Sequence, residues 1–170
     1  MSTDAVPEGL DGPDEFEEFA RARAAQLYRS AWLLCGDAHQ AEDLVQETLA
    51  KVYAKWRRPF GGRIDNPAAY AQTTLTRTFI SGRRRRSSGE VPYADLPDAP
   101  LVDSTGGADL RLELRELLGG LSETDRAVLV LRFVEDLGVE EVAQRLGLTP
   151  GAVKNRSMRA LARARDRSTA

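Results

Sequence analysis

The sequence predicts an all-α protein made of two small helical domains joined by a flexible linker. Apolar residues recur every three or four positions along most of the 170 residues, which is the spacing of amphipathic helices. Aromatic residues make up only 6% of the chain, and Val and Ile form no strand-like runs. Between the two periodic parts, residues 87–108 contain Pro, Gly, Ser and Asp without periodicity, which is typical of a linker.

The first domain is expected to span residues 14–86, after a disordered tail of residues 1–13. Its first helix is predicted over residues 14–35 because the apolar residues there keep helical spacing. Acidic residues occupy the first turn of this helix, where the helix dipole favours them.

A second helix is predicted over residues 38–57, with Asp37 as its N-cap and Gln40 three residues further on, a capping-box pattern. One face of this helix is apolar. The opposite face carries Asp43 and Glu47, which lie side by side because they are four residues apart. Like charges at this spacing are mildly destabilising, so a basic partner is one interpretation of this face, and a simply solvated surface is the other.

Asn66 and Pro67 begin a third predicted helix, residues 67–86, since Asn suits a cap and Pro suits the first turn. Its apolar positions are few. It carries Tyr70, several hydroxyl groups and four consecutive arginines, Arg83–Arg86. Such a helix can contact a nucleic-acid backbone and stack a base. The alternative is a helix whose last turn carries cations that suit its dipole.

The second domain is expected to span residues 109–170. Its first helix ends at Gly119-Gly120, and its apolar positions are mainly leucines: Leu110, Leu112, Leu114, Leu117, Leu118 and Leu121. Ser122 begins the next helix as an N-cap, and we expect that helix to continue to about Asp136.

The last two predicted helices have the pattern of a helix-turn-helix. A short helix, Val139–Leu146, ends at Gly147, and Thr149 with Pro150 begins a second helix that continues through Arg165. In this motif the second helix enters the major groove of DNA, where Lys, Asn and Arg side chains can bind base edges. An ordinary helical hairpin with a solvated basic face is the alternative.

Basic and acidic side chains alternate in blocks along the chain, although the net charge is only −2. Residues 57–86 hold eight basic and one acidic side chain, and residues 126–170 hold nine and five. The blocks before and between them are acidic. Two separate basic patches suit a protein that contacts a polyanion at two places, although charge blocks of this kind also serve solubility alone.

The sequence lacks the motifs of catalysis and metal binding. It has no phosphate-binding Gly-Lys-Ser/Thr loop, no nucleophile elbow and no HExxH. Cys35 and His39 are the only Cys and His, and two ligands do not make a zinc site. We therefore expect no enzyme, no catalytic residue, no metal site and no cofactor. The chain shows no signal peptide and no apolar stretch of bilayer length, so we expect a cytoplasmic protein with no membrane partner.

Three segments together resemble bacterial RNA polymerase sigma factors of the extracytoplasmic-function class (ECF, group 4 of the sigma-70 family), of actinobacterial type. The segment GDAHQAEDLVQETLAKVYAKW, residues 36–56, is similar to region 2.2 of that family. The segment NPAAYAQTTLTRTFISGRRRR, residues 66–86, is similar to regions 2.3 and 2.4. Residues 117–165, which include the helix-turn-helix, are similar to region 4.

The resemblance implies a protein that binds core RNA polymerase and directs promoter-specific transcription initiation by recognising the −10 and −35 elements. The residues that would dock on the coiled coil of the polymerase β′ subunit are Asp43, Leu44, Val45, Gln46 and Glu47. The residues that would bind the −10 element are Tyr70, Thr74, Arg77, Thr78, Arg83, Arg84, Arg85 and Arg86. The residues that would bind the −35 element are Thr149, Gly151, Ala152, Lys154, Asn155, Arg156 and Arg159.

The implied partners are core RNA polymerase, through its β′ and β subunits, promoter DNA and, as for many members of the family, an anti-sigma factor. The first domain would capture an unpaired base of the −10 element. The acidic linker would extend toward the active-site and RNA-exit channel of the polymerase.

The sequence departs from the family pattern at a few positions. Gln72 and Thr73 stand where the family often has arginines, Gly82 stands near a usual aromatic residue, and Asn155 replaces a frequent Ser. Two other classes of function remain open from the residues alone. One is a stand-alone helix-turn-helix regulator that acts without polymerase docking, and the other is a pure interaction protein. The DLVQET motif of residues 43–48 favours the sigma factor, because a stand-alone regulator has no use for it.

Overall fold

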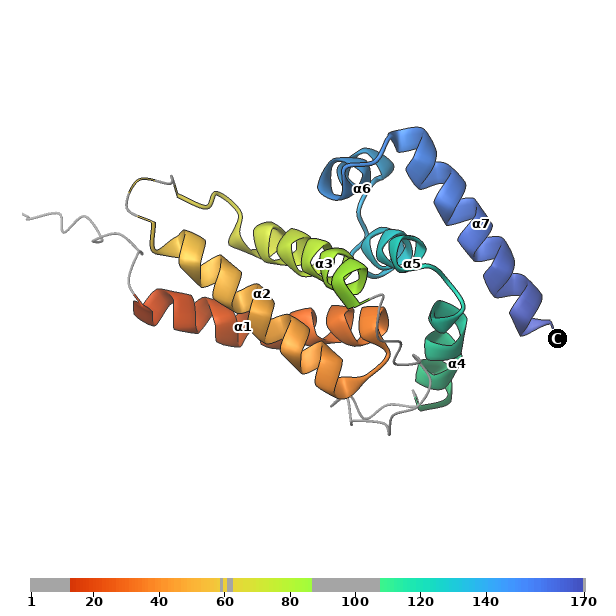
Figure 1. Ribbon diagram of the computed structural model, residues 1–170, viewed down its shortest axis with the longest axis horizontal. Coiled ribbons are helices and arrows are strands. Elements are labelled where there is room, and N and C mark those ends of the chain that lie inside the picture. Colours follow the sequence, from red (N-terminus) through yellow and green to blue (C-terminus); the bar gives the residue numbers. More distant parts are fainter. Residues whose placement is uncertain (1–12, 59, 61–62, 87–107, 170) are drawn as a thin grey trace, which may run out of the picture.

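Every described element of the computed structural model is a helix, so the all-α prediction is confirmed (Figure 1). The structure describes residues 13–58, 60, 63–86 and 108–169. The helices are α1 (Pro13–Cys35), α2 (Ala38–Trp56), α3 (Pro67–Arg86), α4 (Ala108–Gly119), α5 (Glu123–Leu129), the π-helix η1 (Val130–Val134), α6 (Val139–Leu146) and α7 (Pro150–Ser168). None of these described helices combines the length and apolarity that crossing a membrane requires.

The predicted tail and linker lie outside the described residues, apart from Pro13 and Ala108, which begin α1 and α4.

The N-caps predicted from the sequence are present in the structure. The Asp37 side chain accepts hydrogen bonds from the N–H groups of His39, at 3.2 Å, and Gln40, at 3.4 Å. These bonds satisfy first-turn N–H groups that have no partner within their own helix.

The first three helices pack as a bundle. Its most deeply buried side chains come from all three helices: Leu27, Leu34, Val52 and Leu75. At the end where α1 begins and α2 finishes, an aromatic cluster has ring centroids 4.8 to 6.3 Å apart and consists of Phe16, Phe19, Tyr53 and Trp56. The bundle is therefore closed at one end by aromatic rings in tilted and edge-to-face contact, and by aliphatic packing along its axis.

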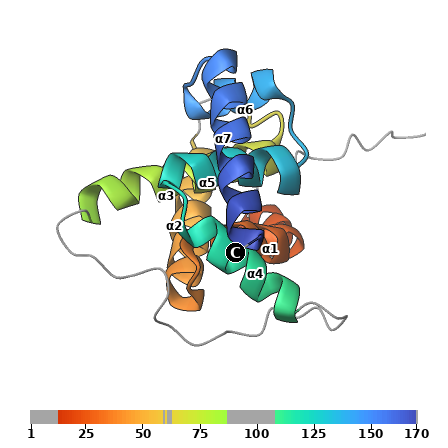
Figure 2. The same cartoon turned by 90° about the vertical axis from the view of Figure 1, so that its right-hand side faces the viewer.

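The predicted helix-turn-helix is present as α6 and α7. Gly147 ends α6 with a φ of 66°, a left-handed conformation that Gly adopts without a steric penalty. Thr149 caps α7, since its hydroxyl accepts a hydrogen bond from the Ala152 N–H at 3.1 Å. A small core holds the two helices against α5 and η1, and it consists of Val128, Leu131, Val142, Ala143 and Val153. The far end of α7 lies beside α4 (Figure 2).

The helix that begins after Ser122 departs from the predicted one. We expected a single helix to about Asp136, but the α-helix ends at Leu129 and the chain continues as a π-helix through Val134. The backbone N–H of Glu135 accordingly donates to the carbonyl of Val130, five residues back, at 3.0 Å. Asp136 then takes a left-handed φ of 54° and ends the segment.

The helices of the second domain pack directly against the first, which the sequence did not predict. In Figure 1, α5 and α6 lie beside α3, and α5 and η1 also contact α1. Ala127 and Val130 are buried in the same cluster as Leu75 and Phe79, and Leu146 packs against it. The described parts of the two predicted domains therefore share a hydrophobic core.

Leu75→Ala is expected to lower the free energy of unfolding by about 2 to 5 kcal/mol, because it leaves a cavity at a side chain with 0% exposure. Urea denaturation followed by circular dichroism measures this loss. The matched control is Leu112→Ala on α4, where 48% of the residue is exposed and the change should stay within about 0.5 kcal/mol. Equal losses at the two positions would contradict the packing described above.

Candidate nucleic-acid and partner interfaces

The outer face of α2 carries three of the five predicted docking residues. Asp43, Gln46 and Glu47 are exposed on this helix. Leu44 and Val45 are only 7% and 8% exposed, because they belong to the core of the first bundle. They hold α2 in place from the core side, and the exposed part of the predicted docking surface is polar and acidic.

Glu47 also forms an ion pair with Lys51, with a Glu47 Oε1 to Lys51 Nζ distance of 3.1 Å. Both side chains of this pair are about half exposed, so the pair contributes little to stability and leaves the carboxylate available to a partner. Asp43 sits one turn earlier on the same face, which gives α2 two neighbouring carboxylates at the surface.

On α3, two predicted DNA-binding residues make contacts with α2 instead. The Tyr70 ring is half-buried, and the Lys55 Nζ lies 4.6 Å from its centroid, a cation–π contact. Thr78 is buried, and its hydroxyl accepts a hydrogen bond from Lys51 Nζ at 3.1 Å. Thr74 is half-buried, and its hydroxyl donates to the Tyr70 carbonyl at 2.7 Å. In this structure the side chains of Tyr70, Thr74 and Thr78 therefore make their contacts within the bundle.

Arg77 is the exposed member of the predicted −10 set whose side chain the structure describes. Its Nε donates a hydrogen bond to the Arg145 carbonyl at 2.7 Å. Arg145 lies in the last turn of α6, where carbonyl groups lack helical partners and carry the negative end of the helix dipole. The backbone of Arg83–Arg86 continues α3, while their side chains lie outside the described part of the chain.

The N-terminal half of α7 presents basic and polar side chains to solvent. Lys154, Asn155 and Arg159 are exposed, as a recognition helix requires. Thr149 and Gly151 are exposed at the start of the helix. The other two residues predicted to contact the −35 element, Ala152 and Arg156, are half-buried.

Arg156 has a structural partner that the sequence did not reveal. Its guanidinium donates to the carboxylate of Asp125 on α5 at 2.7 Å, and the Asp125 side chain is only 14% exposed. The pair connects α7 to α5. The sequence shows that Asp125 lies in the first helical turn, because it is three residues after the N-cap Ser122. The sequence does not show that its partner is Arg156, 31 residues away.

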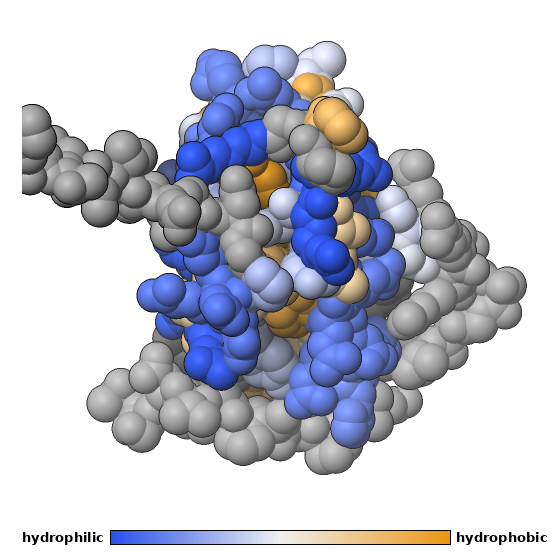
Figure 3. Space-filling view, turned by 90° about the vertical axis from the view of Figure 1, so that its left-hand side faces the viewer, coloured by the Kyte–Doolittle hydropathy of each residue, from blue (hydrophilic) through white to orange (hydrophobic). Residues whose placement is uncertain are grey.

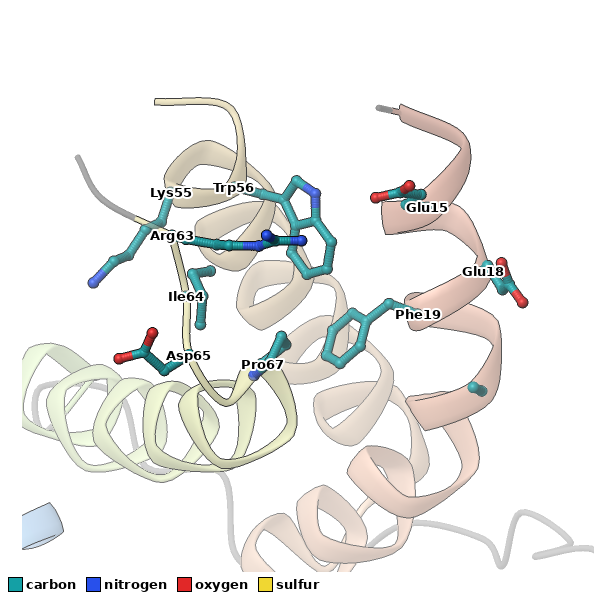
Figure 4. Close-up of a pocket in the computed structure, with 10 residues that line it drawn as sticks. Glu15, Glu18, Phe19, Lys55, Trp56, Arg63, Ile64, Asp65 and Pro67 are labelled. Atoms are coloured by element: carbon teal, nitrogen blue, oxygen red, sulfur yellow. The ribbon is translucent and has the colours of Figure 1, made fainter. Parts of the chain in front are cut away.

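A cavity of about 560 Å³ opens between the start of α1, the end of α2 and the segment that leads into α3 (Figures 3 and 4). Figure 4 shows the Trp56 and Phe19 rings beside this cavity, and Figure 3 shows apolar atoms amid a hydrophilic surround on this side of the molecule. Two cations and three carboxylates also line it: Lys55, Arg63, Glu15, Glu18 and Asp65.

The chemistry of this cavity suits a planar ring more than a phosphate. The aromatic faces and the Ile64 side chain supply apolar area, while the carboxylates outnumber the cations. The Trp56 Nε1–H is buried and has no hydrogen-bond partner among the described residues. Our sequence analysis did not identify the cavity, and the available signal was the pair of aromatic residues near the ends of two helices, Phe19 and Trp56.

The described residues were compared with the requirements of a metal site and of acid–base chemistry. They contain no group of three or more His, Cys, Asp or Glu side chains that could hold a metal ion. Burial, with smaller contributions from Glu42 and Asp37, raises the pKa of the Tyr28 hydroxyl, which therefore stays neutral at physiological pH.

Two protein families match the chain. The sigma-70 region 2 family matches residues 19–89, and the sigma-70, region 4 family matches residues 111–163. The RNA polymerase sigma-E factor of Streptomyces coelicolor is 38% identical over 152 residues, which cover 89% of this chain and 85% of that protein. The ECF RNA polymerase sigma factor SigL of Mycobacterium tuberculosis is 35% identical over 139 residues, covering 78% of this chain and 77% of that protein.

Solved structures match both helical parts at once. The sigma factor RpoE of Bartonella quintana, crystallised with the anti-sigma factor NepR, is similar with a TM-score of 0.70 and 27% identity. This match covers 90% of this chain and 96% of that one. CnrH, solved in complex with the cytosolic domain of CnrY, shares the fold with a TM-score of 0.60 and 21% identity, over 91% of this chain and 88% of that one.

Arg156→Ala is expected to lower the free energy of unfolding by about 1 kcal/mol, since it breaks a half-buried ion pair. Arg159→Ala, on the same helix but exposed, should change it by less than about 0.5 kcal/mol. Chemical denaturation of Arg156→Ala, Asp125→Ala and the double variant gives the coupling energy between the two residues. A coupling energy near zero would show that Arg156 is held by nothing on α5.

Proposed function

Since this chain belongs to the sigma-70 family, in its ECF class, we propose which of its surfaces carry out that family's function. The protein is an ECF-type sigma factor, which binds core RNA polymerase and directs promoter-specific transcription initiation. The assignment of one surface to the polymerase and another to DNA rests on one observation. An exposed acidic face on α2 and an exposed basic face on α7 occur in the same chain and on different helices.

The proposed docking surface for core polymerase is formed by Asp43, Gln46 and Glu47 of α2. Two carboxylates on one rigid helix suit a basic partner, and the β′ coiled coil is the partner that the family resemblance implies. Leu44 and Val45 support this surface from the core and are not expected to touch the polymerase. The second domain and the linker of residues 87–108 would engage the β subunit and the RNA-exit channel.

The proposed −35 surface is the N-terminal half of α7. Lys154 and Asn155 point to solvent from the first turns of the helix, the part that reaches base edges in this motif. Arg159, one turn further on, is placed to contact a phosphate. Arg156 serves instead to fix the angle of α7 against α5 through its ion pair with Asp125.

The proposed −10 surface is the exposed side of α3, with Arg77 and the Arg83–Arg86 run as phosphate contacts. Tyr70 and Thr78 contribute by keeping α3 fixed on α2, while Thr74 bonds within α3 itself. The cavity beside Trp56 and Phe19 is the proposed place for the unpaired base, because its aromatic faces can stack a planar ring.

A further partner is suggested by a protein of similar structure. RpoE of Bartonella quintana was solved with an anti-sigma factor, and we propose that an anti-sigma factor also binds this chain. The proposed place of action is the cytoplasm, where core polymerase and promoter DNA are found. A stand-alone regulator, the alternative considered from the sequence, is not favoured, since it leaves the acidic face of α2 without a role.

Asp43→Arg combined with Glu47→Arg is expected to abolish capture of the factor by immobilised core polymerase. The charge reversal replaces attraction by repulsion at the proposed docking surface. The matched control is Asp14→Arg with Glu18→Arg, an exposed carboxylate pair at the same spacing on α1, which should leave capture unchanged. Circular dichroism checks that both double variants remain helical. Retained capture by the Asp43/Glu47 variant would refute the docking surface.

Lys154→Ala combined with Arg159→Ala should flatten the salt dependence of holoenzyme binding to promoter duplex. Each lost phosphate contact reduces the slope of log affinity against log salt by about 1, so the double variant should lose about 2. The matched control is Arg21→Ala, an exposed arginine on α1 that belongs to none of the proposed DNA-binding sets. A wild-type slope in the Lys154/Arg159 variant would exclude phosphate contacts from this part of α7.

A further inference from the structure

The helix α7 continues well past the residues that are proposed to read the −35 element. It has 19 residues, which span about 28 Å at about 1.5 Å per residue. Lys154, Asn155 and Arg159 lie within its first ten residues. Its last turns lie beside the end of α4 (Figure 2). The second half of α7 is therefore in contact with its own domain, while the first half presents the proposed DNA surface.

The apolar packing of this second half is slight. Among its described residues, the buried ones are Ala160 and Ala164, whose side chains are single methyl groups. A hollow of about 280 Å³ lies between α7 and the end of α4, and it is lined by Leu117, Gly120, Leu121, Arg163, Asp166 and Arg167. Apolar contact has no direction, so these few methyl groups alone leave the tilt of α7 poorly fixed at this end.

The guanidinium of Arg167 crosses from α7 to α4. Its Nη1 donates a hydrogen bond to the carbonyl of Glu116 at 2.9 Å. Glu116 lies in the last turn of α4, where carbonyl groups lack helical partners and carry the negative end of the helix dipole. A cation is favoured at such an end, so the contact is both electrostatic and directional.

The guanidinium fits at this place because Gly120 has no side chain. A Cβ on Gly120 would overlap the guanidinium carbon and both terminal nitrogens of Arg167. The φ of Gly120 is not positive, so what matters at this position is the space that the residue leaves. Alanine at position 120 would therefore displace the end of one flexible side chain and break its bond to α4.

Arg167 is the second arginine that joins α7 to the rest of its domain. Arg156 pairs with Asp125 of α5 at 2.7 Å. The two arginines are eleven residues apart, which is about three helical turns, so they lie on the same side of α7 and about 16 Å apart along its axis. A helix that is held at one point can turn about that point, whereas two contacts on one side fix its tilt.

We propose that Arg167 and Gly120 are positioning residues for promoter recognition, because their contact fixes the tilt of α7 and thereby the fit of its first turns to the −35 element. In a helix-turn-helix the first helix crosses the DNA backbone while the second lies in the major groove. A tilt of α7 relative to the other helices moves Lys154 and Asn155 across the base pairs. This inference rests on the proposed −35 surface.

Gly120→Ala and Arg167→Ala test the proposal in holoenzyme that contains the full-length factor. The probes are a promoter duplex that the wild-type holoenzyme transcribes and the same duplex with its −35 element replaced. We expect the ratio of the two affinities to fall roughly three- to tenfold in each variant, the range that one net hydrogen bond represents. A mere loss of folded factor would lower both affinities equally, so the ratio reports positioning.

The matched control is Arg165→Ala, which removes an exposed arginine two residues before Arg167. It should leave the ratio at the wild-type value. In the Arg167→Ala background Gly120→Ala should have no effect, since the added methyl group then meets no guanidinium. Gly120→Ala should also keep the wild-type slope of log affinity against log salt, because it removes no charge.

Hydrogen exchange in the free factor tests the contact without polymerase or DNA. The amides in the last turns of α7 should exchange faster in Gly120→Ala and Arg167→Ala than in the wild type, and Arg165→Ala should leave their rates unchanged. Circular dichroism checks that each variant is helical. Unchanged exchange in Gly120→Ala and Arg167→Ala would refute the contact itself.

Two binding results would overturn the positioning role. One is an unchanged affinity ratio in the folded Gly120→Ala and Arg167→Ala variants. The other is an equal loss in Arg165→Ala, which would assign the effect to charge alone. A wild-type holoenzyme that does not distinguish the two duplexes would refute the proposed −35 surface and the positioning role with it, while the exchange comparison would still judge the contact between α7 and α4.

Discussion

The arrangement of the whole chain depends on the buried boundary that α5 and η1 share with α1 and α3. Ala127 and Val130 complete a hydrophobic cluster whose other buried members belong to the first bundle. Apolar burial has no direction, so by itself it would permit many orientations of the two halves. The buried Arg126 and the half-buried Glu135 select one, because a charge withdrawn from water is stable only where its hydrogen-bond partners are in place. The hydrophobic contact supplies the association, and the two charged side chains supply the geometry.

On either side of this boundary, the helical period of α2 and α7 places packing residues on one face and charged residues on the other. Val45 on α2 and Val153 on α7 face the cores, while Glu47 and Lys154 face solvent. Side chains three or four residues apart share a face, so one amphipathic helix can be held rigidly and still present a charged surface. The ion pair between Arg156 and Asp125 adds a polar contact to this apolar packing and fixes the angle of α7 against α5.

The third helix does not have this separation. Thr78 faces α2, while Gln72 and Arg77 contact the second domain, so both sides of α3 are engaged in packing. Its weak apolar stripe fits this situation, because polar residues make many of its contacts. The proposed DNA-binding role of α3 and its packing role then compete for one surface.

The sequence by itself determined the helices, most of their ends, the helix-turn-helix and the family. These features depend on signals that extend over a few residues, such as the Asp37 cap, Gly147 and the period of apolar positions. Only the tertiary structure decided the π-helical register that turns Glu135 inward, the burial of Thr78 and the joining of the two halves. Gln72 and Glu135 are 63 residues apart in the chain, and no local pattern relates them. Their contact exists because the packing of η1 against α1 and α3 brings one carboxylate to three donors, which is a property of the folded chain as a whole.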